Sequence, residues 1–404
     1  FLQAFPHGIK YAGSSCSFTD HTGVFCMRKI LGAVIVFLFY ALIFPVPVKG
    51  AEEMTEELME KMDFDEVQEM LNEMLGEGRF SFSEALKKLV TGEDAFSKEA
   101  VQEFLHGLFF SGLSREKTLF FRILLLILLS AIFAGFGEVF DGGQVGEISF
   151  YVVYLLLFTM LMDSFSALCV SLSENLSWLS RFMKVLSPAY FLAVAASSGG
   201  TTAAVFYEGV LLLVWLIQWI LLTVILPGIH ICTVVRFVNN LSREEMLGKL
   251  SELLETGINW GLKTLLGLVI GLQVVKNLVA PVMDSLKRSV VGKTAGAIPG
   301  VGNAVNAVTE LIVTGAVLVR NSLGIVVLIA LLLAGAGPVI HYGMLSLSYR
   351  FLAAVAQPVS DKRIVGCLST MGESCGLLLR LLLTVDVLCM LTFIILMVSF
   401  GGGP

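Results

Sequence analysis

The chain alternates long apolar stretches with short polar ones from about residue 118 to residue 400. A helix needs roughly 20 predominantly apolar residues to cross a bilayer, and seven stretches meet that length clearly while two are weaker candidates. The seven are Leu119–Phe136, Ile148–Val170, Val185–Phe206, Val210–Val235, Trp260–Val279, Asn321–Val339 and Gly376–Val398; the two are Ala307–Val319 and Tyr342–Ala356. We therefore predict an all-α, polytopic membrane protein with about seven to nine transmembrane helices.

The polar stretches divide this membrane body further. Asn239–Asn259 is amphipathic and charged, which predicts an interfacial or cytoplasmic helix. Pro281–Asn306 is rich in glycine and too polar to span, so we expect it at the interface. Arg and Lys near the first span favour the orientation opposite to the one that an upstream signal would impose, and the sequence does not decide between them.

The N-terminal region has the pattern of a secretory signal. Arg28 and Lys29 follow Met27, an apolar core runs from Ile30 to Pro45, and Val48-Lys-Gly50 offers a cleavage site before Ala51. We predict a cleaved signal peptide over 27–50 and treat 1–26 as an upstream extension without a structural role. An uncleaved signal anchor is the alternative, and both place the next segment outside the cytoplasm.

The segment 51–117 predicts a small extracytoplasmic set of amphipathic helices ahead of the body at 118–400. Apolar residues recur there at helical spacing, at Leu58, Met62, Phe64, Val67, Leu71 and Met74. Ser81-Phe-Ser-Glu84 has the form of a capping box that opens a helix, and Thr91-Gly92 would end that helix. The apolar surface is too small for an independent domain, so the segment is expected to pack on the body or on a partner, or to act as a solvated spacer.

Composition agrees with a membrane protein and limits the partners. Of the 404 residues, 56% are hydrophobic and only 15% are charged, whereas globular domains are near 25% charged. Residues 51–117 hold 17 Asp plus Glu against 7 Lys plus Arg, while the net charge of the whole chain is −6. An acidic segment of this kind argues against nucleic acid or anionic lipid as its partner.

A run of small and hydroxyl residues interrupts the apolar region near position 200. The run is Ser197, Ser198, Gly199, Gly200, Thr201 and Thr202. In lipid every backbone N–H and C=O must find a partner within the protein, so this run should lie inside a helix bundle or line a wet cavity. Close helix packing through small residues is one interpretation, and a broken helix at a transport or channel site is the other.

Four ionisable residues fall within the predicted spans: Asp163, Lys276, Arg380 and Asp386. A charge at the centre of a bilayer costs at least about 2.5–3.5 kcal/mol, so each of them requires an explanation. Pairing between spans, a bound ion or proton path, and a position closer to the interface all remain open. Arg380 and Asp386 are six residues apart, so each needs a partner on another helix.

Motifs for catalysis or cofactor binding are missing from the sequence. There is no G-x-x-x-x-G-K-[ST] and no H-E-x-x-H, and Gly292-Lys-Thr294 is only a fragment of the first. The seven cysteines include no C-x-x-C pair. We therefore predict a non-enzymatic protein without a cofactor or metal.

Several blocks, in order, resemble the stage III sporulation protein AE family. They are Ala195–Gly200 with Ala203-Ala and Phe206; Ile298-Pro and Val301-Gly with Asn321 and Gly324; and Gln357-Pro with Cys367-Leu. The resemblance extends from about Met27 to the C-terminus. It implies a multi-pass protein of the mother-cell membrane around the forespore, in a channel complex that supports late forespore transcription. The implied partners are a secretion-type ATPase and the other membrane and ring-forming proteins of that complex.

Three hypotheses follow for the function. The first is a channel or permease subunit of that secretion or feeding complex, indicated by the Ser197–Thr202 run and by the absence of an energy-coupling motif. The second is a membrane scaffold that recruits the other subunits through the acidic segment. The third is an independent ion-coupled transporter that uses Asp163 and Asp386.

Overall fold

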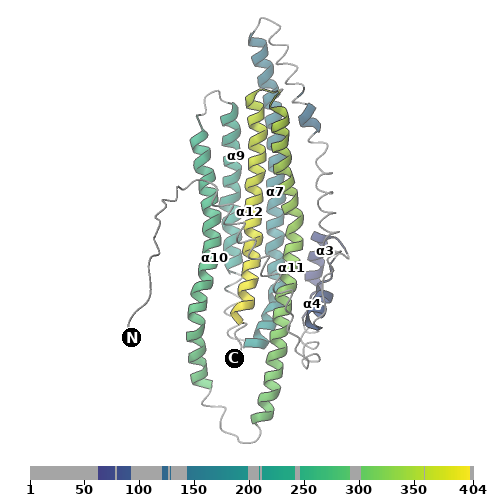
Figure 1. Ribbon diagram of the computed structural model, residues 1–404, viewed down its shortest axis with the longest axis vertical. Coiled ribbons are helices and arrows are strands. Elements are labelled where there is room, and N and C mark those ends of the chain that lie inside the picture. The colour runs from purple at the N-terminus through teal and green to yellow at the C-terminus, as the bar shows by residue number, and fades with distance from the viewer. Residues whose placement is uncertain are drawn as a thin grey trace, which may run out of the picture. The chain divides into compact units, whose positions relative to one another are not determined.

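The computed structural model describes residues 62–77, 80–91, 121–125, 128, 143–198, 209, 212–241, 246–291, 302–358 and 360–400. All regular secondary structure in these ranges is helical (Figure 1). The chain separates into Phe1–Phe44 and Pro45–Pro404, and every described residue belongs to the second unit. The expected upstream extension and the expected signal peptide thus lie outside the described residues, as does most of the first predicted span, Leu119–Phe136.

Long apolar helices make up the membrane body. They are α7 (Gly143–Ser198), α10 (Gly248–Val291), α11 (Gly302–Ala356) and α12 (Lys362–Phe400), and a further helix runs from Leu212 through a π-helical turn η1 (Leu221–Ile225) into α9 (Leu226–Leu241). Five of the helices in the described part are long and apolar enough to cross a membrane. Trp215, Trp219 and Trp260 are exposed on them, as is typical of side chains at a membrane interface.

The pairs α7–α11 and α11–α12 are antiparallel neighbours. The α7 and α11 helices are antiparallel, because the Tyr342 hydroxyl donates to the Leu168 carbonyl at 2.8 Å and the Tyr349 hydroxyl lies 3.4 Å from Ser164 Oγ. The α11 and α12 helices form a hairpin closed by the turn at Gln357-Pro358, directly after the predicted end of the span Tyr342–Ala356. Figure 1 shows these three helices beside one another.

Continuous helices replace several of the predicted breaks between spans. Ile148–Val170 and the described part of Val185–Phe206 belong to the single helix α7, which has 56 residues and is therefore about 84 Å long. The α11 helix likewise joins Asn321–Val339 to Tyr342–Ala356. Polar residues between two apolar stretches do not stop a helix when the stretch contains helix-forming residues, and Ser171–Lys184 contains Leu, Glu, Arg and Met.

A proline explains the π-helical turn. Pro227 lacks a backbone N–H, and its ring would clash with the carbonyl group of Thr223 in a regular α-helix. The chain places η1, Leu221–Ile225, immediately before this proline and continues as α9 without ending. A π-turn of this kind inserts one residue into the helix, so the helix passes the proline inside the fourth predicted span.

The single helix predicted over Asn239–Asn259 is interrupted in the structure, because residues 239–241 belong to α9 and residues 248–259 belong to α10. The α9 helix ends at Leu241, α10 begins at Gly248, and Met246-Leu247 form a turn between them. The Asn239 side chain accepts a hydrogen bond of 2.9 Å from the Leu247 backbone N–H. Short polar side chains that bond to nearby backbone compete with helix, and here that bond stabilises the turn.

Two short helices that pack on the body occur in the described part of the acidic segment, residues 62–77 and 80–91. They are α3 (Asp65–Leu75) and α4 (Phe82–Thr91), and α4 ends at the predicted residue. Ser81 Oγ accepts the Glu84 backbone N–H at 3.3 Å, which is one half of the predicted capping box. The Lys88 ammonium group, at 2.7 Å from the Glu84 carboxylate, lowers the pKa of Glu84.

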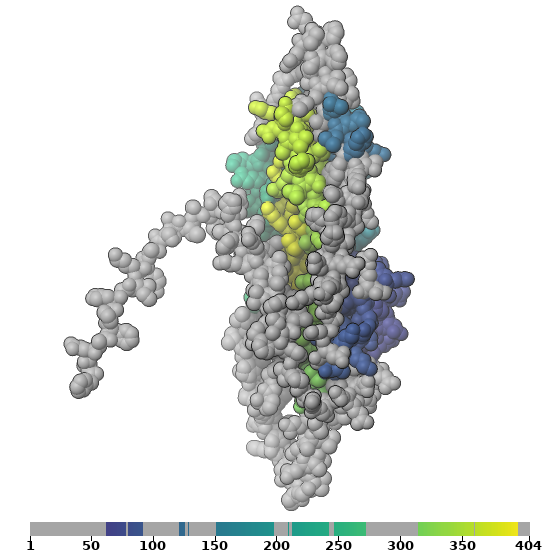
Figure 2. Space-filling view, turned by 45° about the vertical axis from the view of Figure 1, so that its right-hand side comes forward, coloured from purple at the N-terminus to yellow at the C-terminus, as the bar shows by residue number. Residues whose placement is uncertain are grey.

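Buried aromatic and polar groups fasten this segment. Trp178 Nε1 on α7 donates to the Met70 carbonyl at 3.2 Å, and Phe64 packs on Phe82 with ring centroids 5.2 Å apart. Gln68 joins the two helices, because its amide accepts from the Phe82 N–H and donates to the Phe80 carbonyl. Figure 2 shows the segment, in purple and blue, on the outer surface of the long helices.

Candidate functional site

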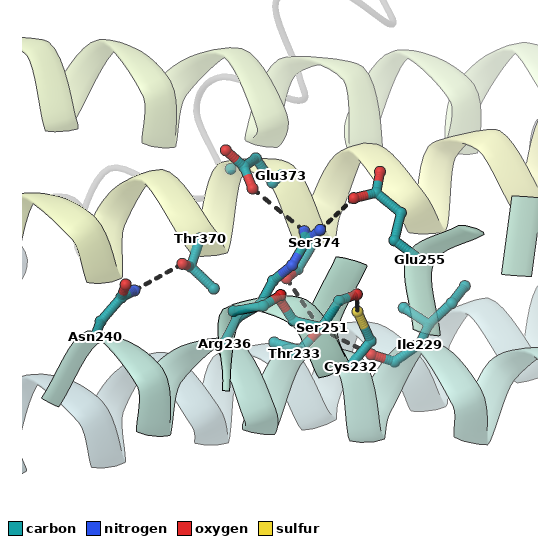
Figure 3. A network of polar contacts seen from close by, with 12 residues as sticks. Ile229, Cys232, Thr233, Arg236, Asn240, Ser251, Glu255, Thr370, Glu373 and Ser374 are labelled. Carbon is teal, nitrogen blue, oxygen red and sulfur yellow. Dashed lines mark hydrogen bonds and ion pairs between the residues drawn. The ribbon is translucent and has the colours of Figure 1, made fainter. Parts of the chain in front are cut away.

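A cluster of paired charges joins α9, α10 and α12 (Figure 3). We call Arg236, Glu255, Glu373 and Arg380 the charge cluster. Arg236 contacts the carboxylates of both Glu255 on α10 and Glu373 on α12, the latter at 3.2 Å. Arg380 reaches the other oxygen of Glu255 at 3.4 Å and Asn259 Oδ1 at 3.3 Å. Cations and anions alternate through the cluster, so no charge in it lacks an opposite neighbour.

Neutral hydrogen bonds extend this cluster along the same helices. Thr233 Oγ1 lies 2.9 Å from Ser374 Oγ, and the Asn240 amide donates to Thr370 Oγ1 at 2.8 Å. The Cys232 thiol lies 3.6 Å from the Ser251 carbonyl oxygen. Side-chain bonds between helices replace bonds to water that a lipid environment cannot provide, so the three helices are held in one register over several turns.

A second polar contact lies at the C-terminal end of α7. Ser197 and Ser198 are the last two residues of this helix, whereas Gly199, Gly200, Thr201 and Thr202 lie outside the described residues. The Arg320 guanidinium group on α11 donates to Ser197 Oγ at 3.2 Å and to Asn321 Oδ1 at 3.2 Å. Its side chain is fully buried, at 0% exposure.

Arg320 follows the weaker predicted span Ala307–Val319 directly, and the prediction from the sequence missed it as a site residue. The available signal was a single cation within the apolar run from Leu311 to Leu333. The Arg320 contact joins α11 to Ser197 on α7, and a hydrogen bond between helices supplies the buried guanidinium group with an acceptor that lipid cannot provide. The Ser197 end of the predicted run thus contacts a buried positive charge.

Three of the four predicted intramembrane charges have described side chains, and each of the three lies in a different environment. Asp163 is exposed on α7, and Arg380 is part of the charge cluster, with its partner Glu255 on another helix. Asp386 on α12 is buried, with 9% of its surface exposed. The side chain of Lys276, within α10, lies outside the described part. Among these residues, the three whose side chains are described do not form one site.

Glycines bring some of the helices close together. A Cβ atom added at Gly267 or Gly271 on α10 would meet no atom within 4 Å, so these two glycines mark no close helix contact within the described part. Gly261 does approach a neighbour, because a Cβ there would lie 2.8 Å from Ile225 Cδ1. Gly335 and Gly372 on the α11–α12 hairpin are equally close to side chains of the partner helix.

A small cavity of about 30 Å³ lies between α7, the helix at 212–225 and α12. Its walls are largely leucine and valine, with Ser180, Gln218 and Thr392 as polar members. Within the described ranges, no group of three or more His, Cys, Asp or Glu side chains is placed to hold a metal ion. The five cysteines in these ranges are free thiols.

These features define an all-helical protein with several apolar helices and paired polar groups between them, a class typical of polytopic membrane proteins. The family described as "Stage III sporulation protein AE" matches residues 80–400, and the chain belongs to that family. The stage III sporulation protein AE of Bacillus subtilis (strain 168) is 24% identical over 330 residues, which cover 80% of this chain and 82% of that protein. No solved structure matches the chain. The family membership supports a sporulation-related role.

Proposed function

We propose that this protein is a non-enzymatic membrane subunit of a sporulation-specific secretion or feeding channel between mother cell and forespore. It acts in the mother-cell membrane around the forespore and is needed for late forespore gene expression. Its partners are a secretion-type ATPase and the other membrane and ring-forming proteins of the stage III complex. Family membership supports the sporulation role, and the arrangement of polar groups supports the channel role.

The buried Arg320 guanidinium group is the observation that carries the channel role. Burying a charge in a membrane is costly, and ionisable groups there commonly mark paths for polar substrates. Arg320 contacts Ser197, which stands two positions before the Gly199–Thr202 run in the sequence. A buried cation that bonds to a hydroxyl group on another helix is the kind of polar group that lines transport paths in membrane proteins.

The test replaces Arg320 by Gln in sporulating cells and counts heat-resistant spores. We expect Arg320→Gln to lower spore formation by at least tenfold at unchanged protein abundance in the membrane, because the buried charge is lost. Arg181→Gln removes an exposed cation from α7 and serves as the matched control, with spore counts close to those of the unaltered protein. Equal spore counts for both variants would contradict the channel role of this site.

A second variant examines the glycine-rich run directly. Replacing both Gly199 and Gly200 by Leu adds bulk that a conduit would not tolerate, so transport should be lost while the protein still inserts and assembles with its partners. Co-purification of the variant with the complex separates a blocked channel from a missing subunit. Normal spore formation by this variant would argue for a scaffold.

The scaffold alternative has its own support in the structure. The outer face of α3 carries Glu66, Glu69 and Glu73, all exposed, while Val67, Met70 and Leu71 are buried against the body. A helix fixed on one side and acidic on the other presents a charged surface to a partner. Replacing the three glutamates by Gln should then abolish binding of the other subunits, which co-purification measures. If the segment does not recruit these subunits, the variant should still co-purify with them.

A further inference from the structure

Asp386 lies at the closest approach of α11 and α12. Its side chain faces Gly335 on α11, where a Cβ atom would be only 2.8 Å from Asp386 Oδ2 and 3.1 Å from its Cγ. The carboxyl group is buried, with 9% of the residue exposed. Glycine at position 335 therefore makes the space that the carboxyl group occupies between the two helices.

No cation faces this carboxyl group within the part of the chain that the structure describes. The facing stretch of α11, Leu331–Val339, contains no titratable residue. On α7, which packs against both α11 and α12, Arg181 and Lys184 are exposed, and on α10 Lys263 is exposed too. The side chain of Lys276 is outside the described part.

The neighbours of Asp386 on its own helix do not neutralise it either. Arg380 is engaged by Glu255 and Asn259 in the charge cluster. Cys389, almost one turn further on, is a neutral thiol that lines the small cavity. Among the described residues, neither an ion pair nor a hydrogen bond to the Asp386 carboxyl group occurs, in contrast to the paired side chains of the charge cluster on the same helix.

An isolated ionised carboxylate in an apolar site is so costly that a protein takes up a proton there instead. We propose that Asp386 is a proton-binding site of the α11–α12 hairpin. The carboxyl group carries a proton while Gly335 lies against it, and the proton passes to water when the two helices separate. The helix contact and the protonation state are thus coupled, and this coupling stands whether or not the protein forms a channel.

Infrared spectroscopy of the purified full-length protein in lipid vesicles tests the protonation state. At neutral pH we expect a protonated carboxylic acid C=O band that disappears in Asp386→Asn. Gly335→Ala, whose added methyl group would displace the carboxyl group, should shift this band. Gly343→Ala is the matched control on the same hairpin, because its Cβ would meet only Leu379 Cδ2 at an ordinary 3.9 Å, and its band should remain unchanged.

The pH dependence of thermal unfolding tests the coupling. If the closed hairpin holds the proton and the separated helices release it, stability from this group is present at low pH and falls as pH rises. The unaltered protein should therefore lose unfolding temperature with rising pH, whereas Asp386→Asn should show a flatter profile. Absence of an Asp386-dependent acid band at neutral pH would overturn the proposal. So would a sodium-dependent unfolding temperature that Asp386→Asn abolishes, because it would indicate a bound cation.

Discussion

The two faces of α12 hold their neighbours in different ways. The face toward α9 and α10 carries Glu373, Ser374 and Arg380, each with a polar partner on the next helix. The face toward α11 uses glycine on both helices, at Gly335 on α11 and Gly372 on α12, where side-chain atoms of the partner helix would lie under 3 Å from an added Cβ.

The two faces of α12 thus hold neighbouring helices together by two different kinds of contact. Helices in lipid have little hydrophobic drive to associate, so polar bonds or close backbone approach must hold them together. Paired charges tolerate small shifts because long side chains can follow, whereas a contact through glycine fixes the separation of the two backbones. We therefore expect small movements to be taken up at the α9–α10–α12 contact, whereas the α11–α12 contact either keeps its spacing or opens.

We expect the largest loss of stability from a change on the face of α12 that packs against α9 and α10. Replacing Arg236 by Ala leaves Glu255 and Glu373 without their shared cation, and we expect a loss of about 3 kcal/mol in unfolding free energy. Urea unfolding in detergent measures it. A double-mutant cycle with Glu255→Ala should recover part of the loss, and simple additivity of the two changes would contradict a shared cluster.

A change on the face where α12 packs against α11 should cause a smaller loss of stability. Gly372→Ala would place a Cβ 2.8 Å from Arg350 Cγ and 3.2 Å from the backbone at Ser346 and Arg350. Because backbone cannot yield easily, we expect a loss of about 2 kcal/mol from overpacking, again by urea unfolding. Gly343→Ala on α11, with its nearest neighbour at 3.9 Å, is expected to be close to neutral. Equal losses at both positions would remove the distinction between the two faces.

We expect the smallest loss of stability from removing a neutral hydrogen-bonding group that links three helices. The Tyr154 hydroxyl on α7 donates to the Phe237 carbonyl on α9 at 2.8 Å, and the Cys367 thiol on α12 donates to the same hydroxyl at 3.0 Å. Tyr154→Phe should cost about 1 kcal/mol in the same assay. Tyr151→Phe alters an exposed tyrosine on the same helix and should change less, so a larger loss there would be unexpected.

Helix class and several helix ends were predictable from the sequence, because periodicity and short motifs specify them locally. The end of α4 at Thr91 and of α11 before Gln357-Pro358 are examples. The merging of two predicted spans into α7 was not predictable, since polar residues such as Glu174 and Arg181 signal an aqueous position but do not interrupt a helix. The turn after Leu241 depends on Asn239 bonding to Leu247, a contact that spacing alone does not reveal.

For the candidate site, too, the sequence predicted some features and missed others. Sequence position was enough to single out Arg380 and Asp386 as charges in apolar surroundings. Their different environments follow from the neighbouring helices, because Glu255 on α10 lies beside Arg380 and Gly335 on α11 lies beside Asp386. Arg320 was missed because its contact with Ser197 joins residues 123 positions apart.

The length of α7 has a mechanical consequence. At about 84 Å, this helix is more than twice as long as the roughly 30 Å hydrocarbon thickness of a bilayer. A tilt of about 5° around its centre displaces each end by about 4 Å, close to the width of one side chain. If the helix tilted as a rigid body, a push on one tip would therefore shift the other tip without any change in secondary structure.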